Sequence, residues 1–142
     1  MSNDDLKSKI IEVMNRSRLS SLATIKDNKP WARYMMIQHS DDLTCYVAAF
    51  LKSRKIEQIK NNSNVHLIMG GSPHNHQLPY INIQATATIS EDLEIKEKYW
   101  YDDLKAYFSG PQDSNYVVII MKPEFIEYME PAKLEPEVYP VN

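Results

Sequence analysis

The segment AAFLKSRKIEQIKNN, residues 48–62, marks the point where the chain changes from a strand pattern to a helix pattern. Residues 43–48 alternate as in a strand, and after a short turn a helix is predicted to begin at Ser53. The Ser53 hydroxyl suits an N-cap, because it can accept a hydrogen bond from an unpaired amide of the first turn. Arg54 and Lys55 then fall where the positive end of the helix dipole disfavours cations by about 0.3–1 kcal/mol each.

Two interpretations of this basic turn are open. In the first, an anion binds at the helix N-terminus and is held by free amides and by both cations. In the second, the turn is a solvated surface, and only Ile56 and Ile59 of the helix face the core. The segment by itself does not separate them.

The composition is that of one globular domain. A chain of 142 residues can bury about two-thirds of the surface that it exposes when unfolded. The net charge of -3 supplies no overall basic field, so we expect no nucleic-acid partner. The single cysteine, Cys45, rules out an internal disulfide and fits a reducing compartment. The polar start MSNDDLKSK and the lack of a long apolar stretch predict a cytoplasmic protein that does not enter a membrane.

The first part of the chain is predicted to form a helix and then strands. Apolar residues recur at helical spacing over residues 3–16. The period then changes to two, which predicts strands at 19–25, 31–37 and 43–48. Asp27-Asn28 is typical of the turn of a hairpin that joins the first two strands.

The second part is predicted to contain four more strands and a second long helix. Two strands, 65–69 and 80–89, flank the turn-rich loop 70–79. Ser90 is expected to cap a helix over 91–108, with an inward face formed by Leu93, Trp100, Leu104, Tyr107 and Phe108. Residues 116–121 are apolar throughout, which predicts a strand buried on both faces. Residues 125–129 alternate after Pro123 and are predicted to close a final hairpin.

These elements do not form a series of alternating strands and helices, so a parallel sheet is not expected. We predict an α+β, mainly β, fold in which an antiparallel sheet of six to seven strands closes into a small barrel flanked by helices. The domain is predicted to span residues 4–130, and the proline-rich residues 131–142 are predicted to form an extended C-terminal tail.

Arg33 is the second basic feature of the sequence. It lies in the middle of a strand, on one face with Trp31 and Met35, and it needs a partner if it is buried. That partner is either a carboxylate or a bound phosphate on which Arg33 and the Ser53 helix converge. The candidate carboxylates are Asp41, Asp42 and Glu57.

An aromatic and sulfur-rich set surrounds these cations in the sequence. It either accommodates a flat apolar ring system or simply fills the core; its members are Tyr34, Met35, Met36, Tyr46, Tyr80 and Trp100. His74 and His76 have no second pair of ligands at metal-site spacing, so we expect no metal. No motif of a known catalytic class occurs, and no catalytic side chain is assigned.

Three stretches together resemble a known family. They are LSSLATIKDNKPWARYMMI (19–37), LTCYVAAFLKSRKIEQIKNNSNVHLIM (43–69) and YINIQATATI (80–89). They look like the pyridoxamine 5'-phosphate oxidase-like flavoproteins with a split β-barrel, and most like their general stress protein 26 group. The resemblance runs from residue 4 to about residue 130. Its most specific signature is Arg33 followed by Ser53-Arg54-Lys55.

The resemblance implies FMN bound at a homodimer interface. Arg33, Arg54 and Lys55 would hold its phosphate, with Ser53 beside them. The backbone of Tyr34, Met35 and Met36 would border the ring, and Trp100 with residues 107–111 would belong to the wall. The remaining expected contacts are Ala48, Ala49 and Tyr80.

The implied activity is that of an FMN-dependent oxidoreductase acting on an unidentified small molecule. The alternative is a flavin-binding carrier or sensor without turnover. The oxidase of this family has a lysine five residues after its strand arginine, where this chain has Gln38, and it has a C-terminal Arg-x-His element that this chain lacks. Oxidation of pyridoxine phosphate is therefore not expected, whereas FMN binding is.

Overall fold

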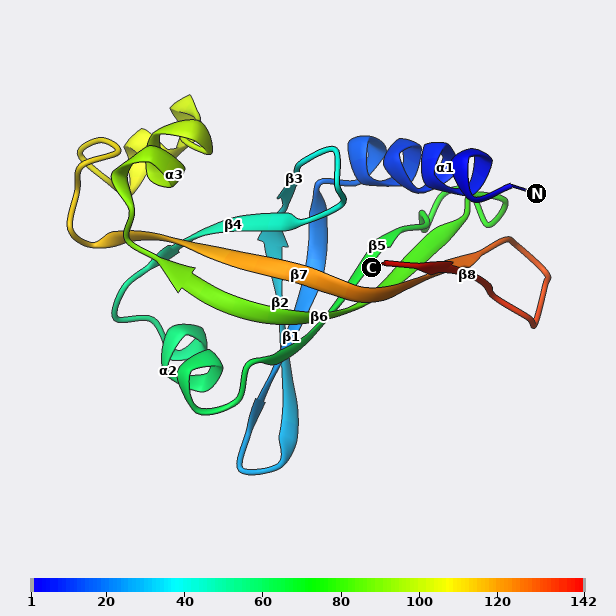
Figure 1. Ribbon diagram of the computed structural model, residues 1–142, viewed down its shortest axis with the longest axis horizontal. Helices are drawn as coiled ribbons and strands as arrows, with labels where there is room; N and C mark the ends of the chain where they lie inside the picture. Colours follow the sequence, from blue (N-terminus) through cyan, green and yellow to red (C-terminus); the bar gives the residue numbers. More distant parts are fainter. Residues whose placement is uncertain (1, 142) are drawn as a thin grey trace.

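One curled antiparallel sheet organises the computed structural model, which describes residues 2–141 (Figure 1). The strand order is β2-β1-β5-β6-β7-β4-β3, with β8 paired to β7. The strands are β1 (Leu19–Lys26), β2 (Lys29–Met36), β3 (Gln38–His39), β4 (Cys45–Phe50), β5 (Asn64–Gly70), β6 (Tyr80–Ser90), β7 (Tyr116–Met129) and β8 (Glu137–Pro140). The antiparallel, mainly β class that the sequence predicts is confirmed.

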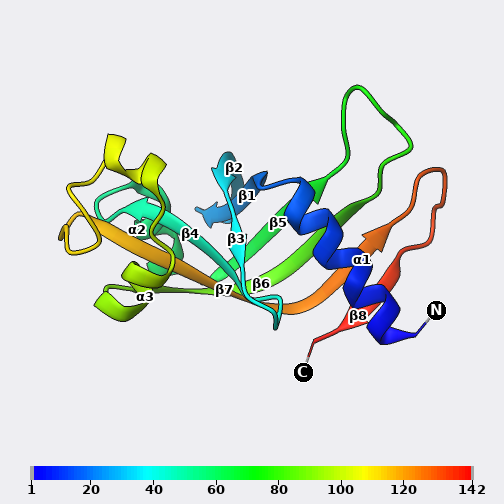
Figure 2. The same ribbon diagram turned by 90° about the horizontal axis from the view of Figure 1, so that it is seen from above.

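Three α-helices and one short 3-10 helix lie around the sheet. They are α1 (Asn3–Arg16), α2 (Arg54–Asn61), α3 (Leu93–Lys98) and η1 (Asp102–Ala106). Figure 2 shows α1 at one end of the sheet and α2 and α3 at the other. No helix of the described residues is long and apolar enough to cross a membrane.

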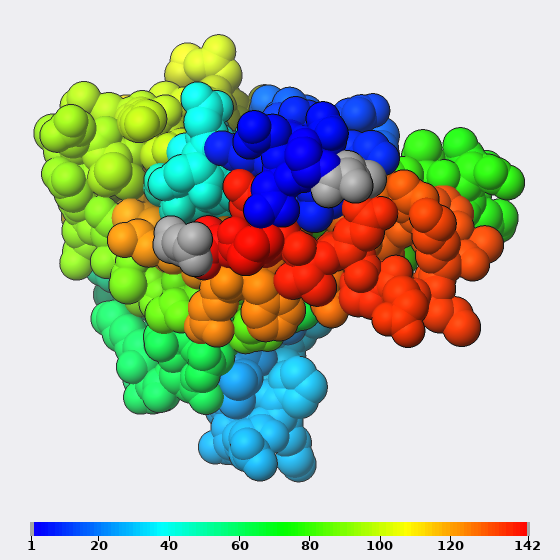
Figure 3. All heavy atoms as spheres, turned by 45° about the vertical axis from the view of Figure 1, so that its right-hand side comes forward, coloured from blue at the N-terminus to red at the C-terminus, as the bar shows by residue number. Residues whose placement is uncertain are grey.

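The β1–β2 hairpin is built as its turn residues predict. Asp27 and Asn28 have φ angles of 52° and 60°, the left-handed values of the tight turn that matches the twist of paired strands. Lys26 pairs with Lys29 across the turn. Pro30 is tolerated because β2 is an edge strand of the sheet. The space-filling view shows the hairpin (light blue) protruding from the body (Figure 3).

The predicted hairpin between 116–121 and 125–129 is wrong. Both segments belong to the single strand β7, which pairs along one edge with β6. The register places Gln84 opposite Phe125 and Ala85 opposite Pro123, so Glu124 is the extra residue of a bulge. A bulge absorbs the proline, which cannot donate a hydrogen bond to the ladder, without ending the strand.

The C-terminal segment 131–142 contains β8, which pairs with β7 from Phe125 to Tyr128. Two short strands, β3 and β8, were not predicted, and one pair of predicted strands is joined. The described residues therefore contain eight strands instead of six to seven.

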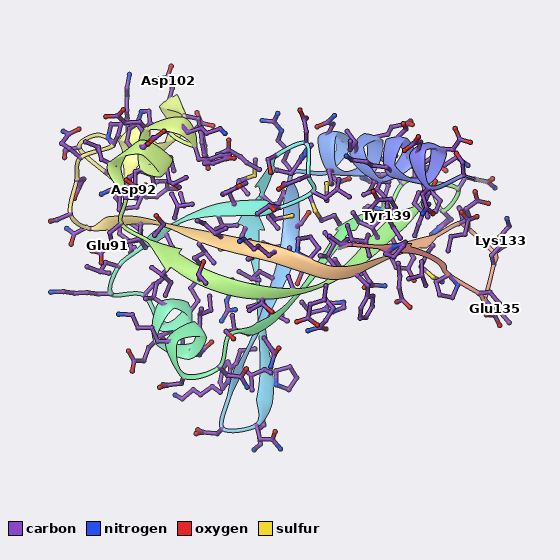
Figure 4. The ribbon with its side chains drawn as sticks, in the orientation of Figure 1. Glu91, Asp92, Asp102, Lys133, Glu135 and Tyr139 are labelled. Carbon is purple, nitrogen blue, oxygen red and sulfur yellow. The ribbon has the colours of Figure 1, made fainter. Side chains whose placement is uncertain are left out.

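The predicted long helix 91–108 is also wrong, because two short helices with a bend between them occupy this segment. Asp92 accepts a hydrogen bond from the amide of Glu94, so α3 begins at Leu93. The chain leaves helical geometry at Tyr99, whose ring stacks on Tyr46 with 3.8 Å between centroids. Figure 4 shows Asp92 and Asp102, at the starts of the two helices, far from Lys133 at the β7–β8 turn.

The inward face expected for that helix is only partly correct. Leu104 and Phe108 are buried, and the Trp100 ring packs against Tyr116 at a centroid distance of 5.4 Å. Leu93 and Tyr107, however, are 47% and 64% exposed. The bend turns these two side chains outward. The helix does not continue through this segment, because the aromatic rings pack on the sheet instead.

The main core joins α1 and α2 to buried residues of β1, β4, β5, β6 and β7. Helix α1 buries Leu6, Ile10, Val13 and Met14, the residues of its predicted apolar face. They pack with the alternating residues of β5 and β6. A second, smaller cluster joins η1 to the start of β7 and contains Leu104, Phe108, Tyr116 and Val118.

Leu67 at the centre of β5 is fully buried, so its truncation is expected to leave a cavity. Leu67→Ala should lower the free energy of unfolding by about 2–5 kcal/mol. Leu134→Ala, the same substitution at a side chain that is 95% exposed, is the matched control and should change it little. Urea unfolding followed by circular dichroism measures both; equal losses would contradict the placement of Leu67.

Candidate functional site

Arg33 on β2 makes four hydrogen bonds, all to neutral groups. Its Nη1 donates to Thr24 Oγ1 at 2.7 Å and to the carbonyls of Trp31 and Leu22 at 3.1 and 3.3 Å. Its Nη2 donates to Gln58 Oε1 of α2 at 3.1 Å. Of the two partners considered for Arg33, a carboxylate of Asp41, Asp42 or Glu57 is therefore wrong, and a bound phosphate stays a prediction. The partner that α2 itself supplies is an amide.

Arg33, Arg54 and Lys55 form a cluster of cations without a carboxylate partner. Burial lowers the pKa of Arg33, and the charge of Arg54 lowers it further. Burial likewise lowers the pKa of Lys55, followed by the charges of Arg33 and Arg54. None of the ion pairs within residues 2–141 includes any of the three. The cluster thus gathers positive charge that an anion would neutralise; we call it the cation cluster.

Ser53 occupies the N-cap position of α2, but its hydroxyl does not cap the helix. It donates to the carbonyl of Phe50 at 2.8 Å, and no side chain of the described residues caps the first turn. The expected role of this hydroxyl as a hydrogen-bond acceptor is therefore wrong. The Ile56 amide donates to the Ser53 carbonyl at 3.2 Å. The amides of Arg54 and Lys55 stay available to a ligand at the end where the helix dipole favours an anion.

An apolar cavity of about 250 Å³ adjoins Lys55. It lies where β2, one edge strand of the sheet, and β4, the neighbour of the other edge strand β3, leave the curled sheet open. Three aromatic residues that follow α3 in the chain form its far wall. The lining residues are Leu19, Tyr34, Met35, Met36, Ala48, Ala49, Phe50, Lys55, Tyr101, Leu104, Tyr107 and Phe108.

Most of the residues expected around a ligand are brought together here. Six of them line the cavity: Tyr34, Met35, Met36, Ala48, Ala49 and Lys55. Arg33 lies behind them in the cation cluster. Tyr80 lies elsewhere, at the start of β6 opposite Gly70 and Met129, and does not line the cavity of its own chain. Trp100 packs in the second core cluster instead of in the wall.

Sequence reasoning missed part of the wall. Phe50 was overlooked because β4 continues two residues beyond the predicted end of its strand. Tyr101 was hidden inside the helix wrongly expected over residues 91–108, although its aromatic neighbours were a usable signal. Leu19 was seen as a strand residue, but the sequence does not reveal that its end of β1 faces the opening.

Other reactive side chains do not belong to the site. Burial, assisted by the charge of Asp42, raises the pKa of the Cys45 thiol to about 12, so the thiol is protonated and unreactive. His74 and His76 lie in the exposed loop between β5 and β6. Within residues 2–141, no group of three or more histidine, cysteine or acidic side chains is placed to hold a metal ion.

Comparison with known proteins places the chain in a family. The pyridoxamine 5'-phosphate oxidase family matches residues 6–130, most of the chain. This chain belongs to that family. It is 34% identical over 136 residues to general stress protein 26 of Bacillus subtilis strain 168, with 96% of each protein covered. The family resemblance expected from the sequence is confirmed.

Solved structures of the pyridoxamine 5'-phosphate oxidase fold agree with this assignment. The crystal structure of general stress protein 26 from Bacillus anthracis str. Sterne is 36% identical, with a TM-score of 0.82 over 95% of this chain and 98% of that one. This likeness confirms the split barrel. A FAD-binding protein of Mesorhizobium loti is only 16% identical and shares the fold, with a TM-score of 0.68 over 84% of this chain and 90% of that one.

The cation cluster is expected to weaken the fold of this chain when no ligand is bound. The pKa of Lys55 is lower in the folded chain than in the unfolded one, so the unfolded chain binds more protons between the two values. Stability therefore rises with pH across that window, and the penalty is largest at pH values below the folded pKa.

Lys55→Met should accordingly raise the melting temperature at pH 7 in a buffer free of phosphate and sulfate. Its advantage over the wild type should shrink as the pH approaches 10.5, the ordinary pKa of lysine. Lys52→Met, at an exposed lysine outside the cluster, is the control and should show no such trend. A Lys55→Met protein that is less stable at pH 7 would contradict the repulsion.

Proposed function

We propose that this chain binds FMN, with the ring in the apolar cavity and the phosphate on the cation cluster. The observation that carries the proposal is Lys55, which lines the cavity and also belongs to the cluster. A phosphate monoester carries a charge of about -1.5 to -2 near pH 7. Such a group would neutralise the mutual repulsion of Arg33, Arg54 and Lys55, and it would accept hydrogen bonds from the uncapped start of α2.

The cavity supports a flat, mainly apolar ligand. Four aromatic side chains besides Phe50 line it: Tyr34 of β2, and Tyr101, Tyr107 and Phe108 of the wall. Ligand sites of this kind combine apolar walls with a few well-placed polar groups that fix orientation. The family and the flavin-binding neighbour of the same fold support a flavin as the occupant.

A bound flavin supplies the redox chemistry, so the lack of an acid–base pair in the wall does not argue against an enzyme. The role of this chain is to hold the phosphate, orient the ring and exclude water from it. We propose that it acts as an oxidoreductase on a small molecule. The alternative is a carrier or sensor that binds flavin without turnover.

A second copy of the chain is the proposed partner. Neighbouring side chains on the outer face of β2, β1 and β5 leave an apolar patch uncovered, and Leu19 and Met36 are directly paired in the ladder. The exposed fractions are 62% for Leu19, 78% for Tyr34, 44% for Met36 and 42% for Ile68. The interface of a dimer that buries this patch would be continuous with the cavity, because three of the four residues also line the cavity. Tyr80 would then reach the ring only from the partner subunit.

Pyridoxine phosphate is not the proposed substrate. Gln38 donates from Nε2 to the carbonyl of Tyr99 at 2.9 Å, so its amide is engaged in holding the bend between α3 and η1. A second phosphate would need its own cations on entering the cavity, because desolvating an unpaired charge is costly. Lys55 is the one cation among the described residues that line the cavity, and it is assigned to the cofactor.

The direct test is the visible spectrum of the purified protein, followed by identification of the released cofactor. A flavin spectrum with FMN in the released fraction is expected. Reduction by NAD(P)H and rapid reoxidation by an added electron acceptor would favour the oxidoreductase over the carrier. A protein that binds no flavin when FMN is supplied would overturn the proposal.

Loss of either cation of the first turn should weaken FMN binding selectively. Arg54→Ala or Lys55→Ala is expected to cost about 1.5–3 kcal/mol, because each removes a charge-assisted hydrogen bond to the phosphate. Riboflavin, which lacks the phosphate, should be nearly indifferent to both changes. Titration calorimetry measures the four affinities, with Lys60→Ala at the exposed end of α2 as the control. Equal losses for both ligands would exclude the phosphate assignment.

A charge placed on the apolar patch should dissociate the dimer. Ile68→Lys lies in the patch but outside the cavity, and it should raise the dimer dissociation constant about tenfold or more, which equals 1.4 kcal/mol. Leu134→Lys, at the 95% exposed residue of the β7–β8 turn, is the control. Sedimentation at micromolar concentration measures both. A wild-type monomer that still binds flavin would refute the dimer.

A further inference from the structure

We propose that a second cavity, between the tip of the β1–β2 hairpin and α2, binds the adenosine half of a flavin dinucleotide. This inference rests on the flavin site proposed above and extends it beyond FMN. The cavity has a volume of about 530 Å³ and is lined by Ile25, Lys26, Asp27, Asn28, Arg54, Glu57, Gln58, Asn61 and Asn62. We call it the hairpin cleft.

The hairpin cleft meets the apolar cavity at the cation cluster. Arg54 lines the hairpin cleft, whereas Lys55, the next residue of the chain, lines the apolar cavity. Gln58 also lines the hairpin cleft and accepts the hydrogen bond from Arg33. The three cations therefore stand between two hollows of different chemistry, which is where the linking phosphates of an extended ligand would lie.

The charges in the hairpin cleft favour a neutral, polar occupant. Lys26 and Arg54 line it together with Asp27 and Glu57, so the lining has no excess of cations. A polyanion such as a nucleic-acid strand would gain little there, because its backbone needs an excess of cations. A nucleoside, by contrast, carries no charge of its own once its phosphate is placed outside the cleft, on the cluster.

The amide side chains of the hairpin cleft match the hydrogen-bonding groups of a nucleoside. Each amide has two donors and an acceptor, which suits both sugar hydroxyls and the edge of a base. Among the described residues, Asn28 and Asn61 make no side-chain hydrogen bond. The Asn62 side chain is engaged only through its oxygen, which accepts from the amide and side chain of Asn64. The lining thus holds donors and acceptors ready for a ligand.

The walls of the hairpin cleft are set by the fold before any ligand arrives. One wall is the tight turn at Asp27 and Asn28, whose left-handed φ angles fix the hairpin tip. The other is α2, which packs against β1 of the same hairpin and accepts a hydrogen bond from Thr24 through Gln58. A preformed site loses less conformational entropy on binding, so a neutral group can add affinity there.

The apolar cavity suits a flat apolar ring, the cation cluster a doubly charged linker, and the hairpin cleft a neutral polar nucleoside. FMN ends at its phosphate and would leave the hairpin cleft empty. FAD carries a diphosphate and an adenosine in that order, so its two phosphates would lie on the cation cluster and its adenosine in the cleft. The expected result is that the chain binds FAD at least as tightly as FMN.

The test compares both flavins with a variant that fills the hairpin cleft. Asn61→Trp places a bulky side chain at the exposed end of α2 where it lines the cleft. It should weaken FAD about tenfold or more, or 1.4 kcal/mol, and change FMN affinity less than about twofold. Lys60→Trp, one residue earlier and outside both cavities, is the matched control and should leave both affinities unchanged. Chromatography of the recovered flavin verifies that FAD was not cleaved to FMN.

A second variant removes one amide without filling the cleft. Asn28→Gly keeps the left-handed backbone that Asn28 adopts and should weaken FAD several-fold while sparing FMN. Wild-type protein that binds FMN but not FAD would overturn this inference and leave the proposed function standing. So would FAD affinity that neither Asn61→Trp nor Asn28→Gly changes. Wild-type protein that binds neither flavin would overturn both.

Discussion

Strand β7 is the constraint on which the rest of the structure depends, because it pairs with three other strands. Residues 118–129 pair with β6, residues 116–121 with β4 and residues 125–128 with β8. A bulge at Glu124 lets one continuous strand carry Pro123 through the middle of the sheet. Without that accommodation β7 would end at the proline. The part of β7 that pairs with β4 would then no longer be continuous with the part that pairs with β8.

The opening of the barrel follows from the order of the strands. The sheet begins at β2 and ends at β3 next to β4, and these edges do not pair with each other. If the two edges had paired with each other, they would have covered the residues that now line the apolar cavity. The barrel is not closed by strand pairing at this point. The aromatic wall after α3 covers the opening instead, because the bend at Tyr99 turns it in that direction. A hollow of this type is stable because its walls belong to two separate, well-packed clusters.

The cation cluster illustrates how a binding site and stability oppose each other. Arg33 is held by the neutral oxygens of Thr24 and Gln58, which orient it without cancelling its charge. A carboxylate in place of Gln58 would have relieved the repulsion between Arg33, Arg54 and Lys55, but it would also have repelled an anion. The amide keeps the geometry and leaves the charge for a ligand.

The sequence by itself determined the local elements and the cations, since these depend on short-range patterns. The apolar period of residues 3–16, the Asp27-Asn28 turn and the placement of Arg54 and Lys55 at a helix start are all properties of neighbouring residues. Tertiary structure decided what depends on packing between distant segments. It joined two predicted strands into β7, broke the helix expected over 91–108 and gave Arg33 a neutral partner, Gln58, where the sequence had left a carboxylate or a phosphate open. The reason is physical: strand continuity, aromatic stacking and charge pairing are settled by which residues meet across the sheet, and a linear pattern does not contain those distances.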